Sequence, residues 1–150
     1  MSGGELMANT AIIDRKTIEK FLTEMKGILN SGNFNIDRDF HFVVERNSDD
    51  PDDEYNNTNT MLELGYDTAD VVEELKTLDI KEYSESMLDT VDTGVNFLHV
   101  FGRTINGRDV YIKVRLKANK KGTNFVLCIS FHFARHKIIN FPSHNLATEQ

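Results

Sequence analysis

Residues 96–133, NFLHVFGRTINGRDVYIKVRLKANKKGTNFVLCISFHF, are the stretch that decides the fold. Apolar and polar side chains alternate along it, which is typical of strands with one buried face. Asn106-Gly107 lies between two such runs and favours a type I′ turn, because that turn needs positive φ at both central positions. The predicted strands of this antiparallel meander are 96–105, 109–117 and 123–133.

The two connections also predict which side chains share a face, if 106–107 is a two-residue loop and 119–122 a four-residue loop. The apolar face then holds Phe97, Phe101, Val110, Ile112, Val114, Leu116, Phe125, Leu127, Ile129 and Phe131. The opposite face holds Leu98, Val100, Tyr111, Lys113, Arg115, Lys117, Val126, Cys128, Ser130 and His132. In this register Tyr111 faces Ser130 and lies diagonal to His132. We expect the apolar face to pack on helices and the other to face solvent.

Helices are predicted upstream of the meander from capping residues followed by apolar residues at steps of three and four. The expected elements are a helix from Asp14 to about Ser31, a strand at 40–44, a helical turn at 60–64 ended by Gly65, a helix at 69–78 capped by Asp67 or Thr68, and a further short helix after Asp79 with Ile80, Tyr83 and Met87 facing inward. Helices before an antiparallel sheet indicate an α+β fold.

A chain of 150 residues with 39% hydrophobic content suits one domain. We expect this domain at 14–136, between a flexible tail at 1–13 and a C-terminal tail at 137–150. The apolar stretch 138–142 of that second tail is expected to dock on the domain. Residues 47–59, NSDDPDDEYNNTN, predict a solvated acidic loop. This loop contains no glycine, which disfavours a calcium site of the EF-hand type.

Charge is divided unequally along the chain. Residues 1–93 hold 8 basic and 22 acidic side chains, whereas residues 94–150 hold 9 basic and 2 acidic ones. Such asymmetry points to a polyanion such as RNA as the partner of the basic part.

The single cysteine excludes a disulfide framework and a cysteine-rich zinc site, and it is typical of proteins of reducing compartments. No apolar run approaches 18 residues, and the first ten residues lack the pattern of a secretory signal. We therefore expect a cytoplasmic protein with no membrane partner, no metal and no cofactor.

The polar face of the meander carries the groups that RNA cleavage without a metal requires. A base must take the proton of the 2′-hydroxyl, an acid must protonate the leaving oxygen, and cations must stabilise the phosphate. His132 and Tyr111 are the predicted acid–base groups. The predicted RNA-binding residues are Lys113, Arg115, Lys117, Ser130 and Arg135, with His136 as a further candidate. His99 falls on the apolar face, so we interpret it as a hydrogen-bonded core residue.

A family resemblance joins these observations. The runs LELGYDTADVVEEL, LKTLDIKEYSESM, FGRTINGRDVYIKVRL and CISFH, in this order over about residues 60–133, resemble the MqsR-like toxins of type II toxin–antitoxin systems. These toxins belong to the wider RelE-type ribonuclease fold. The resemblance implies an mRNA endoribonuclease neutralised by a cognate antitoxin, with Tyr111 as the active-site tyrosine and His132 at the basic position of the last strand.

Two positions differ from the family pattern. Glu85 stands near the place of a family lysine, and Leu98 near the place of a glutamine. These differences motivate an alternative, a non-catalytic RNA- or protein-binding module on the same fold. A weaker alternative is an acidic protein that imitates nucleic acid through Asp49–Glu54.

Overall fold

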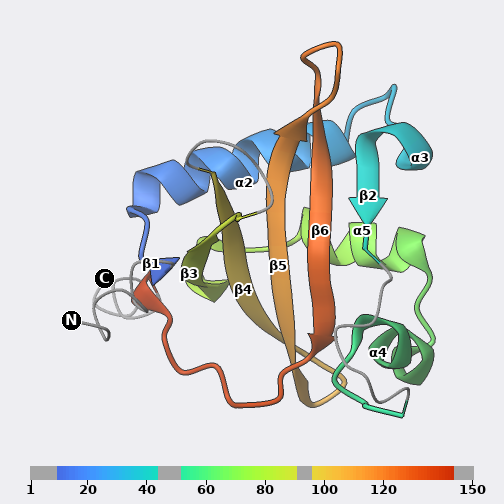
Figure 1. Cartoon of the computed structure of the whole chain (residues 1–150), viewed down its shortest axis with the longest axis vertical. Helices are drawn as coiled ribbons and strands as arrows, with labels where there is room; N and C mark the ends of the chain where they lie inside the picture. Colours follow the sequence, from blue (N-terminus) through green and yellow to red (C-terminus); the bar gives the residue numbers. More distant parts are fainter. Residues whose placement is uncertain (1–9, 44–51, 91–95, 144–150) are drawn as a thin grey trace.

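The computed structural model describes residues 10–43, 52–90 and 96–143, and these residues form four helices and one six-stranded sheet. The helices are α2 (Arg15–Leu29), α3 (Ile36–Asp39), α4 (Asn57–Leu64) and α5 (Thr68–Lys76), and a 3₁₀ turn covers Ile80–Glu82. The strands are β1 (Thr10–Ala11), β2 (Phe40–Phe42), β3 (Tyr83–Leu88), β4 (Phe97–Ile105), β5 (Arg108–Ala118) and β6 (Asn124–Phe133). The strand order is β1-β3-β4-β5-β6-β2 (Figure 1). The predicted α+β class is confirmed.

The meander of β4, β5 and β6 is the centre of the sheet, as predicted. Asn106 and Gly107 have φ values of 52° and 79°, and Ile105 pairs with Arg108 across this tight turn. The outer strands differ from a purely antiparallel sheet, because β2 runs parallel to β6 at one edge. None of the helices in the described parts of the chain is long and apolar enough to cross a membrane.

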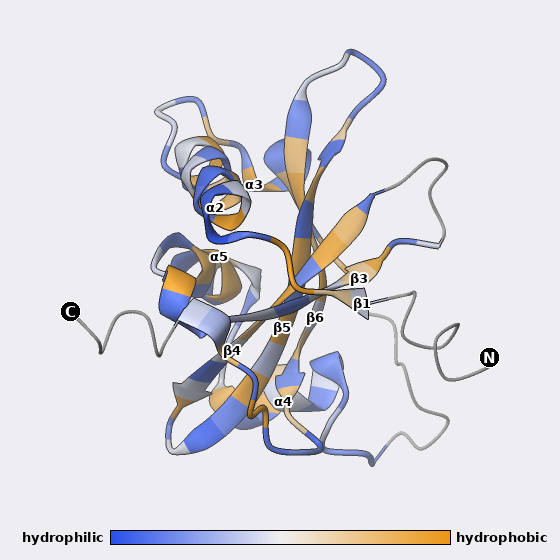
Figure 2. Cartoon of the chain, turned by 90° about the vertical axis from the view of Figure 1, so that its left-hand side faces the viewer, coloured by the Kyte–Doolittle hydropathy of each residue, from blue (hydrophilic) through white to orange (hydrophobic). Residues whose placement is uncertain are grey.

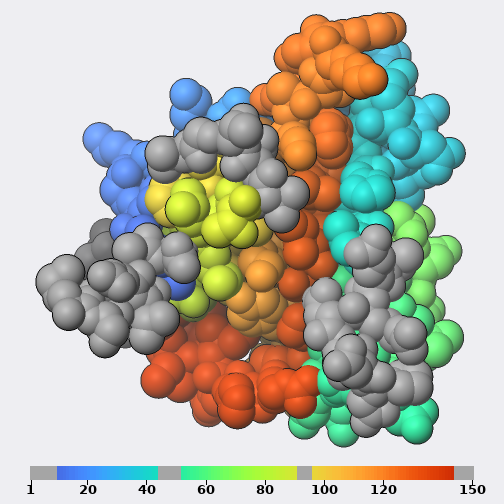
Figure 3. All heavy atoms as spheres, in the orientation of Figure 1, coloured from blue at the N-terminus to red at the C-terminus, as the bar shows by residue number. Residues whose placement is uncertain are grey.

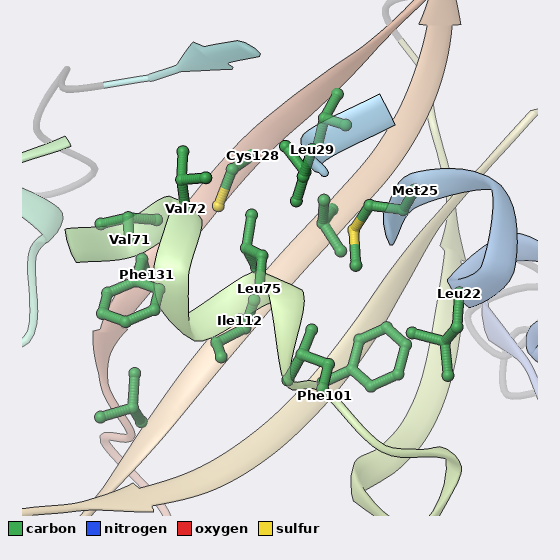
Figure 4. Close-up of a cluster of buried hydrophobic side chains, with 14 of the residues drawn as sticks. Leu22, Met25, Leu29, Val71, Val72, Leu75, Phe101, Ile112, Cys128 and Phe131 are labelled. Atoms are coloured by element: carbon green, nitrogen blue, oxygen red, sulfur yellow. The ribbon is translucent and has the colours of Figure 1, made fainter. Parts of the chain in front are cut away.

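One face of the sheet is covered by α2 and α5, whose hydrophobic sides point toward the strands (Figure 2). Asp14 caps α2 through the Thr17 amide, and Asp67 forms a capping box with Asp70 at the start of α5. The core between helices and strands is built from large apolar side chains that include Leu22, Met25, Leu29, Val72, Leu75, Phe101, Ile112 and Phe131 (Figure 4). The predicted burial of the apolar sheet face is thus confirmed for Phe101, Val110, Ile112, Val114 and Phe131.

Two segments complete the free edge of β6. β2 pairs with residues 126–128, and α4 binds the rest of this edge with side chains instead of backbone. The Asn57 amide donates to the carbonyls of Val43 and Ile129 at 2.7 and 2.9 Å, and its Oδ1 accepts the Phe131 N–H at 3.0 Å. Thr60 Oγ1 accepts the Phe133 N–H at 2.9 Å. Polar side chains therefore continue the ladder where the β2 strand ends.

The predicted loop at 47–59 is wrong at its C-terminal end. α4 begins at Asn57 with Asn56 as its cap, and both asparagines are buried. Asparagine is favoured in loops, but the side-chain amide of Asn57 forms hydrogen bonds with the backbone of β6. The local sequence does not indicate these bonds. Residues 44–51 lie outside the described part of the chain.

Two other expectations need correction. Asp79 caps only one 3₁₀ turn, after which Tyr83 to Leu88 form a strand instead of a helix. A spacing of four between Tyr83 and Met87 fits both periods, so the pattern was ambiguous. At the N-terminus, Thr10 and Ala11 pair with β3, so the predicted tail at 1–13 is structured from Thr10 onward, while residues 1–9 lie outside the description.

The register between β5 and β6 also differs from the prediction. Ala118 pairs with Asn124 rather than Thr123, and a bulge at Ile129 separates the pairs Lys113–Ser130 and Val114–Cys128. The bulge turns Val126 and Cys128 into the core, where burial raises the pKa of the Cys128 thiol. It also removes Phe125, Leu127 and Ile129 from the predicted apolar face, whereas Ser130 and His132 keep the face of Tyr111.

His99 is half-buried beside the core and hydrogen-bonded, in line with the expectation that it is not a site residue. The Ile13 N–H donates to Tyr83 Oη at 3.0 Å, and Tyr83 Oη, Ser86 Oγ and His99 Nδ1 follow at 2.7 Å steps. The ring also packs on Phe21, with centroids 4.6 Å apart. Burial, with a smaller effect of the Arg115 charge, lowers the pKa of His99 to about 4. His99 is therefore a neutral ring hydrogen-bonded at the end of a chain of two hydroxyls.

This environment makes folding stability depend on His99 in acid. The imidazole of His99 has a pKa near 6.5 in the unfolded chain and near 4 in the folded one. The stability that neutral His99 contributes to the fold is therefore fully present above pH 6.5 and is lost as the pH falls toward 4. We expect the stability difference between wild type and His99→Asn to shrink by about 2–3 kcal/mol between pH 7 and pH 4.5. Urea unfolding at both pH values measures this change, and a difference that is constant with pH would contradict it.

Candidate functional site

Tyr111 and His132 form the centre of the candidate site. They are directly paired residues of β5 and β6, and their rings stack with centroids 5.3 Å apart and planes inclined by 16°. The prediction placed His132 diagonal to Tyr111. The longer 119–123 connection and the Ile129 bulge shift the register by two residues, so the two rings lie opposite each other.

A cavity of about 350 Å³ opens beside this pair. The sheet contributes Glu85, Val100, Tyr111 and His132 to its wall, and the chain after β6 contributes residues 134–140. The rings of Tyr111 and His132 are half-buried, so they are accessible from the cavity while part of each is shielded from water. Acid–base groups inside a cavity are the common arrangement of an active site.

The hydrogen bond of His132 determines which ring nitrogen can accept a proton. Nδ1 lies 2.9 Å from the carbonyl oxygen of Phe133, and a carbonyl can only accept, so Nδ1 carries the hydrogen. Burial lowers the pKa of His132 most strongly, and the Lys113 and Arg135 charges lower it further against the opposing effects of the Phe133 bond and Asp53. The ring is neutral at neutral pH, and Nε2 holds a lone pair.

Tyr111 has the opposite protonation preference. Burial and the nearby Glu85 carboxylate raise the pKa of its phenol to about 12, so the hydroxyl keeps its proton. The hydroxyl donates to Met87 Sδ at 3.6 Å, a weak acceptor that a better one readily displaces. The pair therefore combines a proton acceptor, His132 Nε2, with a proton donor, the Tyr111 hydroxyl.

Of the predicted phosphate-binding cations, Lys113 lies beside the Tyr111 ring. Its Nζ lies 5.9 Å from the centroid of the Tyr111 ring and 4.0 Å from Met87 Sδ. Burial lowers the pKa of this amine, an effect that the Asp89 carboxylate opposes. A half-buried ammonium group beside the phenol interacts more strongly with an anion than one in water.

Arg115 occupies a different environment from the predicted one. Its side chain is 9% exposed and forms a 2.7 Å ion pair with Asp89, which is 6% exposed. Arg115 Nε also donates to the Leu116 carbonyl at 2.9 Å. These contacts place its guanidinium inside the protein, where it holds the end of β3 against β5.

The other predicted binding residues are dispersed. Lys117 lies six residues along β5 from Tyr111, about 20 Å away at strand spacing. Ser130 pairs with Lys113 but is only 2% exposed. Arg135 lines the cavity, with its guanidinium bonded to Asp53 and lying 4.7 Å from the centroid of the Tyr55 ring. The structure thus brings Tyr111, His132 and Arg135 to one cavity, with Lys113 beside it.

Ion pairs join the acidic residues of 1–93 to the basic residues of 94–150, which the unequal distribution of charge along the sequence does not reveal. All four arginines of residues 94–150 bond to carboxylates of the acidic half: Arg103 to Glu74 and Glu82, Arg108 to Glu54, Arg115 to Asp89, and Arg135 to Asp53. Much of the predicted basic surface is therefore matched within the fold.

Three residues around the site were not predicted to take part in it. Glu85 differs from the family pattern, yet it lines the same cavity as Tyr111 and His132. Asn57 bonds both sides of the Ile129 bulge and so supports the strand that carries His132. Met87 Sδ accepts a hydrogen bond from the Tyr111 hydroxyl. Their spacing along the chain gives no signal, because each acts through pairing between distant segments. Within the described residues, no three His, Cys, Asp or Glu side chains gather as metal ligands.

Comparison with known families connects this geometry to a group of proteins. Residues 46–133 match the family described as "Motility quorum-sensing regulator, toxin of MqsA". Neither a curated protein nor a solved structure matches the chain. The matched region covers β3 to β6 together with Tyr111 and His132, and it is more than half of the chain. The chain therefore belongs to the motility quorum-sensing regulator family, whose members are the toxins of MqsA.

Proposed function

We propose that this toxin is an endoribonuclease that cleaves mRNA and is silenced by binding its antitoxin. Membership of the family makes the chain the toxin of a toxin–antitoxin system, with a protein of the MqsA kind as the antitoxin partner. RNA cleavage is the chemistry that the Tyr111–His132 pair supports best. The carrying observation is that a neutral imidazole and a protonated phenol stack against each other at one cavity.

The reaction we propose is transphosphorylation within the RNA strand. His132 Nε2 takes the proton of a 2′-hydroxyl, and the 2′-oxygen forms a new bond to the adjacent phosphorus. The bond between phosphorus and the 5′-oxygen breaks, and the Tyr111 hydroxyl gives its proton to that leaving oxygen. The products are a 2′,3′-cyclic phosphate and a 5′-hydroxyl, and the proton on His132 returns to Tyr111 through solvent.

Lys113 supports the phosphate during this step. Its ammonium lies beside the Tyr111 ring, where negative charge collects on the phosphate oxygens as the new bond forms. Arg135 stands at the rim of the same cavity and contributes a second positive charge. Arg115 is left out of this role because it holds Asp89 inside the fold.

A sharp test compares two tyrosine variants in the presence of EDTA. Tyr111→Phe removes only the proposed acid, and we expect cleavage of a single-stranded RNA to fall by about 10²–10⁴-fold. Tyr66→Phe is the matched control, because its hydroxyl bonds Glu74 away from the cavity, and it should cleave at the wild-type rate. Fluorescence of an end-labelled RNA gives both rates.

Two outcomes would defeat this proposal. If the folded wild type shows no cleavage but binds RNA with an affinity that falls steeply as the salt concentration rises, the chain is the RNA-binding module of the alternative hypothesis. If Tyr111→Phe cleaves as fast as Tyr66→Phe, the phenol is not the acid and the site lies elsewhere.

A further inference from the structure

The chain beyond β6 crosses the face of the sheet that carries Tyr111 and His132. The Ala134 N–H donates to the Asp109 carbonyl at 2.8 Å, and from there residues 135–143 run back past β5 and β4 to β3 (Figure 1). At the far side Asn140 Nδ2 donates to the Ser84 carbonyl at 3.4 Å, and Ser143 is buried. We name residues 134–143 the C-terminal strap. It lies outside the region that matches the family.

The strap packs on Gly102, directly beside the candidate site. This residue of β4 is the cross-strand partner of Tyr111 and is buried. A Cβ atom at Gly102 would lie 2.8 Å from Ile138 Cδ1 and 3.0 Å from Phe141 Cζ, so both side chains pack on bare backbone. The predicted docking of the stretch 138–142 is thereby confirmed.

The strap makes a cavity out of an otherwise open sheet face. Figure 3 shows it along the lower border of that face, with a small hollow between it and the strands. The cavity of about 350 Å³ has strap residues on one side and Glu85, Tyr111 and His132 on the other. This volume lies at the lower end of the roughly 300–1,000 Å³ of small-molecule pockets, a size that suits one nucleotide.

Charge differs between the two ends of this cavity. Arg135 and His136 follow β6 and lie at the His132 end, and Arg135 is held there by Asp53 and the ring of Tyr55. Glu85 and Asn140 lie at the β3 end, where they offer a carboxylate and an amide. At the first end a phosphate can accept hydrogen bonds from Arg135, whose guanidinium Asp53 holds in place, and from His136. The Glu85 carboxylate repels a phosphate from the second end, where the polar groups of a base can bond.

We propose that the C-terminal strap completes a binding site for a single ribonucleotide of the RNA strand. The phosphate lies at the Arg135–His136 end beside His132, and the base extends to Glu85 and Asn140. This inference rests on the proposed function, because it names which part of the substrate occupies the cavity. It implies that the RNA must be single-stranded at the site, since a paired base cannot enter.

The test measures binding of the four ribonucleoside 3′-monophosphates, with inorganic phosphate as a second probe, by NMR of the full chain. We expect at least one nucleotide to bind wild type ten times more tightly than phosphate, with shifts at Gly102, Ile138 and Asn140. Gly102→Val displaces Ile138 and Phe141 and should weaken this binding at least tenfold. The control is Gly27→Val on exposed helix surface, where an added Cβ meets nothing within 4 Å.

Several results would overturn the inference. These are equal affinity for phosphate and all nucleotides, shifts confined to residues away from the strap, or wild-type affinity in a folded Gly102→Val variant. If Gly102→Val does not fold, the wild-type shift map and the phosphate comparison still decide. Nucleotide binding at the strap without RNA cleavage would defeat the proposed function alone, whereas RNA cleavage by a protein that fails the shift test would defeat this inference alone.

Discussion

His132→Ala is expected to lower the rate of RNA cleavage by about 10²–10⁴-fold, the usual contribution of a general base. The reason is that Nε2 of this ring is the proton acceptor in the pair, with Nδ1 committed to the Phe133 carbonyl. His41→Ala is the matched control, because His41 is exposed on β2 and does not line the cavity. Single-turnover cleavage at pH 7.5 measures both variants, and equal rates would remove His132 from the mechanism.

The pH profile gives a second readout of the same residue. Because burial and two cationic neighbours lower the pKa of His132, the neutral ring persists below pH 6.5. We expect the wild-type rate to be level through neutral pH and to fall tenfold per unit only below the lowered pKa. No loss is expected up to about pH 10, since the pKa of Tyr111 is raised to about 12. The residual activity of His132→Ala should lack the acidic limb.

Arg115→Met is expected to destabilise the fold by about 3–5 kcal/mol, because it leaves Asp89 buried without the arginine charge. If Arg115 served mainly to bind RNA, the variant would lose affinity for RNA while its stability stayed near wild type. Urea unfolding followed by circular dichroism separates these two roles.

The double variant Arg115→Met with Asp89→Leu provides the control for that experiment. Replacing a buried ion pair by apolar side chains of similar size is often neutral for stability. We therefore expect the double variant to recover most of the lost stability and to cleave RNA close to the wild-type rate. A double variant that is stable but inactive would show that the Arg115 charge acts on the RNA.

Local chemistry explains which parts of the fold were predictable. The Asn106-Gly107 turn needs positive φ at two positions, and Asp14 and Asp67 cap helices by bonding amides three residues away. Each signal depends on neighbours in the sequence. Gly65, with φ of 71°, likewise ends α4 at the predicted residue. Such elements are specified by the residues that form them.

The unpredicted features depend on distant partners. The bulge at Ile129 is held by Asn57, 72 residues away, and nothing in the run CISFH indicates it. The loss of Arg115 from the polar surface depends on its ion pair with Asp89, which follows β3 and lies 26 residues away in the sequence. Tyr111 and His132 still share one face of the sheet, because His132 comes after the bulge and so returns to the face of Tyr111.

The ends of the RNA products test the central statement most directly. A synthetic RNA cleaved by wild type in EDTA, with its fragments weighed by mass spectrometry, should give 2′,3′-cyclic phosphate and 5′-hydroxyl ends. The same RNA with a single 2′-deoxy substitution at the cleaved position should remain intact there. Fragments with 5′-phosphate and 3′-hydroxyl ends, or cleavage next to the 2′-deoxy nucleotide, would contradict proton transfer by Tyr111 and His132.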